Sequence, residues 1–239
     1  MMPSYLYIPL LLFTLCVSAQ LSAQQKAILS DSGNYCLWYD NLFSSDSVLV
    51  SFILNNRNQE SNISSIPTSY ENMIHIKKNI RVPEFVLGHL LNYNSVIQSL
   101  TESTKQNKIE NNIKEKICYY CGQAKISKKF DSHLFILQHN NSRQNTEDEE
   151  ILIDDKMILV NMLGNKITSI SCMLSYFCWN GILTYSQIDS YKKNDYLFVS
   201  SKEDGDIVIK NDSESYYRKD EVRFKFTDMG QINIIPLKQ

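Results

Sequence analysis

The chain has 239 residues, with 24 Lys and Arg against 26 Asp and Glu, so its net charge at pH 7 is −2. This balance excludes the strong basic field by which proteins gather nucleic acid or anionic lipid. A hydrophobic content of 43% predicts a folded protein, and only 7 glycines leave little material for glycine-built phosphate loops.

Residues 1–23 have the pattern of a cleaved signal peptide. An apolar run, Leu6 to Val17, is followed by small residues, and Ala19 and Ala23 both offer a suitable cleavage position. The run is shorter than the roughly 20 apolar residues that cross a bilayer as a helix. We therefore predict that cleavage leaves no stable transmembrane span.

Two alternatives to a cleaved signal follow from single residues. No Lys or Arg precedes Lys26, so an uncleaved anchor stays open. A lipid anchor would use Cys16, but Leu15 stands where a lipoprotein signal has a small residue. The predicted location is outside the cytoplasm: periplasmic, associated with the outer membrane, or secreted.

Cleavage would leave about 215 residues, enough for one core that buries about 70% of the unfolded chain's surface. We predict a single mainly β domain over residues 24–239. The alternative is a division into a mixed α/β part, 24–112, and a β-meander, 113–239, with the boundary near 105–125.

Strands are predicted in the first half wherever apolar residues run together or alternate, at 34–39, 47–54 and 74–82. The polar residues 55–68 predict a loop. Pro83 opens a predicted helix, Glu84 to about Lys105, within which Ser95 and Gln98 have the spacing of a capping box. Residues 113–121 fit both a strand and a helix.

The second half predicts a series of strands, at 133–138, 157–162, 166–178, 181–188, 196–200, 206–210, 216–227 and 231–235. Alternation in the third of them places Ile170, Leu174 and Tyr176 on one face. Tight turns are predicted at Gly164-Asn165, Asp204-Gly205 and Met229-Gly230. The predicted fold is mainly β, or α+β with one helix near 84–105. Its antiparallel meander forms a barrel or a sandwich-like sheet.

The phrases MILVNMLGNKITSI and RFKFTDMGQI carry a resemblance that covers roughly residues 119–235. In this part the chain resembles uncharacterised exported β-rich proteins of Bacteroidota. The resemblance implies export and a β-meander. It implies no catalytic residues, because these phrases are structural.

Cys118 and Cys121 are a candidate disulfide or redox pair, and the ordinary alternative is two reduced, packed thiols. A working Cys-x-x-Cys thiol needs a lowered pKa, usually at a helix N-terminus, whereas the flanking residues here favour strand and turn. With His133 and His139 the spacing is near that of a zinc site. Six residues of strand would separate these histidines by roughly 20 Å, so we assign no metal.

Other polar clusters favour ordinary structure. Asp131-Ser132-His133 has the residue types of a hydrolase triad, but neighbours in a strand point to opposite faces. The acidic stretch Glu147 to Asp155 lacks the order of a calcium loop, and we interpret it as a solvated loop. No motif identifies a cofactor or a catalytic residue.

The prediction is a non-catalytic binding or structural component of the cell envelope, with an envelope protein or a glycan as partner and no nucleic acid. The 14 tyrosines are compatible with a face for sugar stacking or protein binding, although aromatic residues in strands usually serve packing. A small envelope hydrolase is the first alternative, favoured if His75, His89 or His133 lies beside an acid and a nucleophile in one pocket. The second is a redox or metal protein using Cys118 and Cys121.

Overall fold

The computed structural model describes residues 39–57, 63–93, 102–139, 152–179, 182–192, 197–204, 207–209, 212–214 and 218–235. The predicted signal peptide, the predicted strand at 34–39 apart from Tyr39, the capping box at Ser95 and Gln98, and the acidic residues 147–150 lie outside the described residues.

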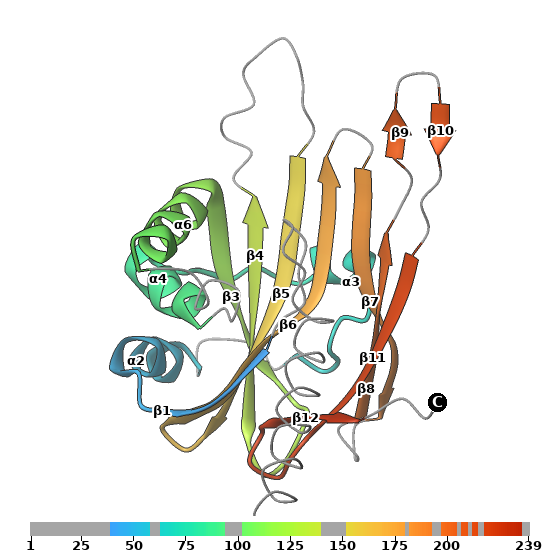
Figure 1. Ribbon diagram of the computed structural model, residues 1–239. Coiled ribbons are helices and arrows are strands. Elements are labelled where there is room, and N and C mark those ends of the chain that lie inside the picture. The colour runs from blue at the N-terminus through green and yellow to red at the C-terminus, as the bar shows by residue number, and fades with distance from the viewer. Residues whose placement is uncertain are drawn as a thin grey trace, which may run out of the picture.

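One open antiparallel sheet dominates the molecule (Figure 1). Its strand order is β12-β11-β8-β7-β6-β5-β4-β3-β2, and β1 pairs with β6 beside this path. The strands of the sheet are β1 (Tyr39–Ser44), β2 (Ile80–Arg81), β3 (Lys116–Ala124), β4 (Asp131–His139), β5 (Leu152–Leu163), β6 (Lys166–Trp179), β7 (Ile182–Lys192), β8 (Leu197–Asp204), β11 (Arg218–Phe226) and β12 (Ile232–Ile235). A separate hairpin consists of β9 (Ile207–Ile209) and β10 (Asp212–Glu214). The prediction of a mainly β protein with an antiparallel meander is confirmed, whereas a closed barrel is wrong because the sheet ends at β2 and β12.

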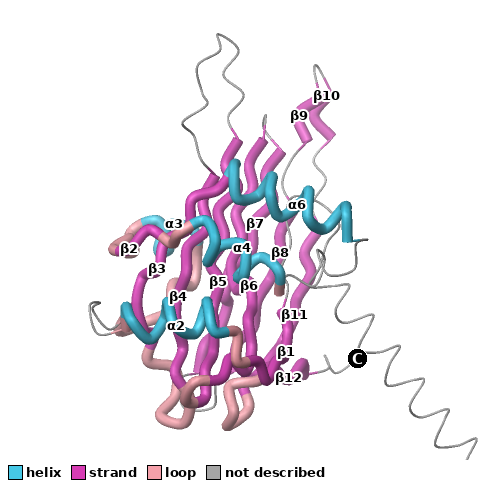
Figure 2. The backbone as a smooth tube through the Cα atoms, turned by 90° about the vertical axis from the view of Figure 1, so that its left-hand side faces the viewer, coloured by secondary structure: helices cyan, strands magenta, loops and turns pink. Residues whose placement is uncertain are grey.

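Three helices cover one face of the sheet, α2 (Ser47–Asn56), α4 (Glu84–Asn92) and α6 (Glu102–Glu115) (Figure 2). Phe52 of α2 places its ring 6.0 Å from that of Tyr120 and 6.4 Å from that of Phe135. Helices α4 and α6 approach each other closely, since a Cβ at Gly88 of α4 would lie 3.4 Å from Ile113 of α6. None of the helices in the described part of the chain is long and apolar enough to cross a membrane.

The turn between β11 and β12 packs on the opposite face. Asn161 of β5 donates hydrogen bonds to Gly230 O (2.8 Å) and Ser169 Oγ (3.0 Å), and Ser169 donates to the same carbonyl (2.6 Å). Gly230 has φ +80°, and a Cβ there would lie 2.9 Å from Thr168 Oγ1. The sheet is therefore covered on both sides in a sandwich-like arrangement, which explains why β5 and β6 are buried on both faces.

The predicted strand at 47–54 is wrong, because this segment forms α2. The carboxylate of Asp46 accepts hydrogen bonds from Val48 N and Leu49 N, both at 3.0 Å, and so caps a helix. Leu49 and Ile53, four residues apart, are fully buried. A continuous apolar run is compatible both with a buried strand and with the inner face of a helix. Here the hydrogen bonds to the Asp46 carboxylate favour the helix.

The predicted strand at 74–82 is also wrong over most of its length. α3 (Tyr70–Ile74) extends to its first residue, and only Ile80–Arg81 pairs with β3. Of the helix predicted from Glu84 to about Lys105, the described residues form α4 and the start of α6, which pack against each other, while residues 94–101 lie outside the described residues. Residues 113–121 belong to both predicted types, because α6 ends at Glu115 and β3 begins at Lys116.

Two irregularities alter the second half of the predicted meander. In β6, Met157 pairs with Leu174 but Ile158 pairs with Cys172, so Met173 is an extra residue. This bulge moves Leu174 to the face opposite Ile170, against the predicted alternation.

The turn at Asp204-Gly205 does not join paired strands, since β8 pairs with β7 and β11. The turns at Gly164-Asn165 and Met229-Gly230 are confirmed.

Candidate functional site

A pocket of about 240 Å³ lies at one end of β3, β4 and β5. Its lining consists of Tyr70, Ile117, Tyr119, Gln138, His139, Ile153 and Asp155. Tyr70 comes from α3, and the other side chains come from the three strands. At about 30 Å³ for each water molecule, the volume equals about eight waters, which suits a small ligand.

The pocket opens on the face of the sheet that the three long helices leave free. Tyr119 precedes Tyr120, whose ring contacts α2, so the alternation of the strand turns Tyr119 to the other side. Asp155 and Asn161 are six residues apart on β5 and share a face, the one on which the β11–β12 turn packs. The pocket therefore lies between the sheet and α3.

Asp155 is the polar centre of the pocket, and it is 5% exposed. Its Oδ2 accepts hydrogen bonds from Tyr70 Oη (3.3 Å) and Gln138 Nε2 (2.8 Å). Burial is the main cause that raises the pKa of the Tyr70 phenol, and the Asp155 carboxylate raises it further. Tyr70 therefore remains a hydrogen-bond donor at physiological pH.

Aromatic rings form the walls beside this carboxylate. Tyr70 stacks on Tyr176 of β6 with ring centroids 3.8 Å apart and an interplanar angle of 11°, which fixes the orientation of its ring. The Nζ of Lys78 lies 5.9 Å from the centroid of the Tyr119 ring. Both lining tyrosines are half-buried, so their rings are partly open to a ligand.

A buried ionic cluster lies on the other face of the strands that line the pocket, because Asp154 and Lys156 flank Asp155 on β5. Lys116 and Lys156 both bind the carboxylate of Asp154, and all three side chains are buried. Burial lowers the pKa of Lys116 and is only partly offset by Asp154. Burial alone would raise the pKa of Asp154, but the two lysines hold it below its usual value.

Lys116 pairs with His139 across the β3–β4 ladder. Burial and then Lys116 lower the pKa of His139, so the imidazole is held neutral. Its Nδ1 is buried and has no hydrogen-bond partner among the residues that the structure describes. A buried polar atom without a partner is costly. His139 follows Gln138 on β4, so the alternation of the strand directs its imidazole to the side of Lys116, opposite the Gln138 amide.

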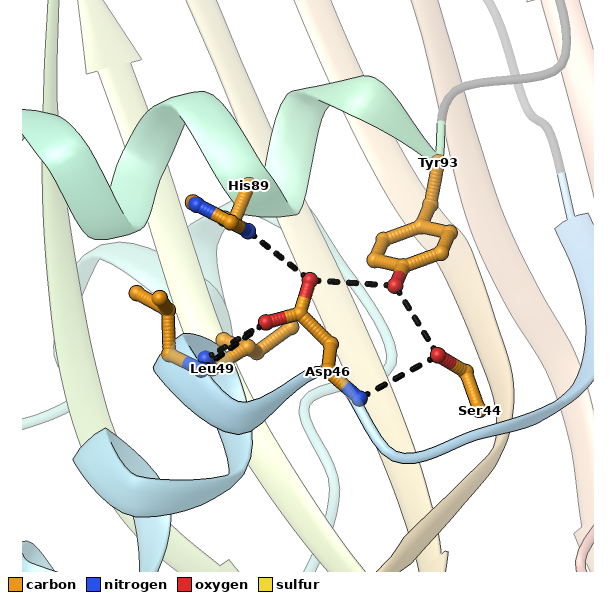
Figure 3. A network of polar contacts seen from close by, with 6 residues as sticks. Ser44, Asp46, Leu49, His89 and Tyr93 are labelled. Carbon is orange, nitrogen blue, oxygen red and sulfur yellow. Dashed lines mark hydrogen bonds and ion pairs between the residues drawn. The ribbon is translucent and has the colours of Figure 1, made fainter.

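A second polar network lies on the helical side of the sheet, around Asp46 (Figure 3). Its Oδ2 is 2.9 Å from His89 Nδ1 and accepts a hydrogen bond from Tyr93 Oη (3.0 Å). Ser44 Oγ lies 3.1 Å from the same phenol and accepts a hydrogen bond from the backbone N–H of Asp46 (3.2 Å). The network joins the N-terminus of α2 to α4.

This network contains the residue types of a hydrolase triad but arranges them as a helix cap. The hydroxyl of Ser44 bonds to Tyr93, while a triad needs the nucleophile on the histidine. Burial alone would raise the pKa of Asp46, but hydrogen bonds from Leu49 N, His89 and Tyr93 together lower it. The fixed carboxylate stabilises the helix, and we assign this network to structure.

The other predicted site residues do not converge. Cys118 and Cys121 form no disulfide and are both 1% exposed, and burial raises the pKa of Cys118, which disfavours the thiolate that redox chemistry needs. The candidate pair stays a prediction. His133 is buried, with Nδ1 3.0 Å from Tyr120 Oη, whereas His75 is exposed at the end of α3. Within the described ranges no three metal-binding side chains gather.

Sequence reasoning missed the residues of the pocket. The interpretation of residues 147–155 as a solvated loop is wrong for Asp154 and Asp155, which are buried in β5. Tyr70 and Gln138 lie 85 and 17 residues from Asp155, so no local spacing connects them.

Comparison of the chain with protein families, with characterised proteins and with solved structures finds no significant match, so the geometry of the pocket alone carries the functional argument.

Proposed function

We propose that the protein is an exported, non-catalytic binding component of the cell envelope, which takes a small polar ligand in the pocket around Asp155. The observation that carries the proposal is the state of Asp155. It is buried at the base of a pocket, and both of its hydrogen bonds with described residues reach Oδ2. Oδ1 therefore keeps its accepting capacity for a ligand.

The composition of the lining supports binding. Its polar groups include a carboxylate, an amide and two phenols, set among Ile117 and Ile153. A few convergent polar groups on an apolar wall are typical of ligand pockets.

A thermal-shift screen of the full chain tests the binding proposal. The compounds are small sugars, polyols, amino acids and alkylamines. We expect at least one compound to raise the melting temperature in a concentration-dependent way. Asp155→Asn should remove most of this shift, because an amide cannot replace a charge-assisted acceptor. The control is Phe85→Ala, which removes an exposed ring from α4 on the other side of the sheet.

Two outcomes would contradict the binding proposal. One is a screen in which no compound shifts the melting temperature. The other is a shift that Asp155→Asn and Phe85→Ala leave equally intact, since the ligand would then bind elsewhere. Each variant's own melting temperature is measured without ligand, which separates loss of binding from loss of fold.

The intact mass of the protein from its native host tests export. We expect a chain that begins at Gln20 or Gln24, because signal peptidase cleaves after a small residue such as Ala19 or Ala23. The same sample, alkylated without reduction, reports how many thiols are free. A full-length mass would contradict export and leave the binding proposal to stand by itself.

A further inference from the structure

We infer that the ligand of the Asp155 pocket is a neutral ring bearing several hydroxyl groups, a single sugar unit that is either free or at the end of a glycan. This inference rests on the proposed function and names its ligand class. Three features of the pocket carry it: its mixed charge, its aromatic walls and its set of hydrogen-bonding groups.

Charges of both signs surround the pocket. Asp155 would repel an anionic ligand at the base. A cationic ligand would approach Lys78, whose ammonium group lies beside the Tyr119 ring. Because Asp154 is already bound to two lysines, it adds no free negative charge for a cation. A ligand with a formal charge of either sign therefore gains little electrostatic binding energy, whereas a neutral ligand is repelled by neither charge.

The aromatic walls suit the apolar face of a sugar ring. Tyr70 is held in place by its stack on Tyr176, and Tyr119 projects from the centre of β3 beside it in the lining. A pyranose presents C–H groups on its faces and hydroxyls around its edge, so it combines an apolar body with a polar rim. Rigid tyrosine rings pack against such a body at low entropic cost.

The polar groups suit the hydroxyls on the edge of such a ring. Each hydroxyl both donates and accepts, and a carboxylate oxygen such as Asp155 Oδ1 accepts a donated hydrogen strongly. The amide of Gln138 is fixed by its hydrogen bond to Asp155 and leaves its oxygen as a further acceptor. The volume of about 240 Å³ fits one ring and no extended chain.

The test compares three ligands that share one ring and differ in charge: methyl glucoside, glucosamine and glucuronate. The same comparison is repeated with the galactose and mannose series. Binding to the full chain is measured by saturation-transfer NMR and titration at pH 7. We expect a neutral member to bind with a millimolar dissociation constant, and its charged analogues to bind at least fivefold more weakly. Methylguanidinium serves as a cation without a sugar ring.

Variants of the lining connect this binding to the pocket. Tyr119→Ala should weaken the neutral sugar at least tenfold, while Tyr119→Phe keeps the ring and should stay within about twofold. Asp155→Asn should weaken it about tenfold, and Phe85→Ala should leave it unchanged. Tighter binding of a trisaccharide that ends in the same sugar assigns the site to a glycan, and equal binding assigns it to the free sugar.

Each contrary result has a distinct meaning. Tighter binding of the amine, the carboxylate or methylguanidinium than of the neutral sugar would overturn the inference. So would sugar binding that Tyr119→Ala does not weaken. If no sugar binds while another compound of the thermal-shift screen still needs Asp155, the sugar inference fails and the proposed function stands. If nothing binds at Asp155, both fail.

Discussion

Replacement of Asp154 by asparagine is expected to destabilise the protein by about 3–5 kcal/mol, because it leaves two buried lysines without a counter-charge. Lys116 and Lys156 both bind this one carboxylate, and both are buried. Asparagine has the same shape, so the cost measures charge and not packing. Urea unfolding at pH 7 gives the free energy of unfolding directly.

The matched control is the same substitution in an exposed pair. Lys129 and Asp228 form an ion pair at 2.7 Å, with side chains that are 56% and 70% exposed. Asp228→Asn should cost less than about 1 kcal/mol, because water already solvates both groups. Similar costs at the two sites would show that Asp154 does not carry the predicted buried charge.

A second variant separates the charge from the site. Replacing all three residues by apolar ones, Lys116→Met with Asp154→Leu and Lys156→Met, should recover most of the stability that Asp154→Asn removes. A buried ionic cluster can often be exchanged for apolar side chains of similar volume at little cost. A triple variant as unstable as Asp154→Asn would indicate that the packing of this region fails, and that the charge is not the cause.

The strands of the second half were predictable because their signals are local. Residues 133–138 and 157–162 are apolar runs of strand length, and Gly164-Asn165 supplies a two-residue turn between β5 and β6. Each of these features acts within a few residues. Their confirmation shows that a meander is encoded by short apolar segments and the turns that join them.

The first half was less predictable because its signals compete. The apolar run at 47–54 is compatible with a strand, and a single capping residue, Asp46, converts it into α2. Tyr119 and Tyr120 differ in surroundings only because β3 alternates, so one ring lines the pocket and the other packs under Phe52. In the second half, the face of the sheet on which each β6 side chain lies depends on the bulge at Met173, which no spacing in the sequence predicts.

The pocket itself depends on tertiary structure. Asp155 gains its role from Gln138 on the neighbouring strand and from Tyr70 on a helix that is distant in the sequence. The tyrosine content predicted an aromatic binding surface in general, but not which tyrosines form it. Asp154, Asp155 and Lys156 are three polar residues in a row, so no local strand pattern marks Asp155 as buried.

Acid should destabilise the protein through His133. Burial, and then the nearby charge of Arg57, lowers the pKa of His133 from 6.5 to about 4. The unfolded chain binds a proton below pH 6.5, whereas the folded chain does not until about pH 4. This contribution to stability is therefore fully present above pH 6.5 and is lost as the pH falls to 4. The loss amounts to about 3 kcal/mol.

The substitution His133→Gln isolates this contribution from that of the carboxylates. Glutamine does not titrate, and its amide can still bond to Tyr120, the partner of His133 at 3.0 Å. We expect the free energy of unfolding of the variant to fall by about 3 kcal/mol less than that of the wild type between pH 7 and pH 4. His75→Gln, at an exposed position, should leave the wild-type slope unchanged. Parallel profiles for the wild type and His133→Gln would mean that His133 is protonated in the folded protein. The buried pair that it forms with Tyr120 beneath α2 would then have to open to water at mild acidity.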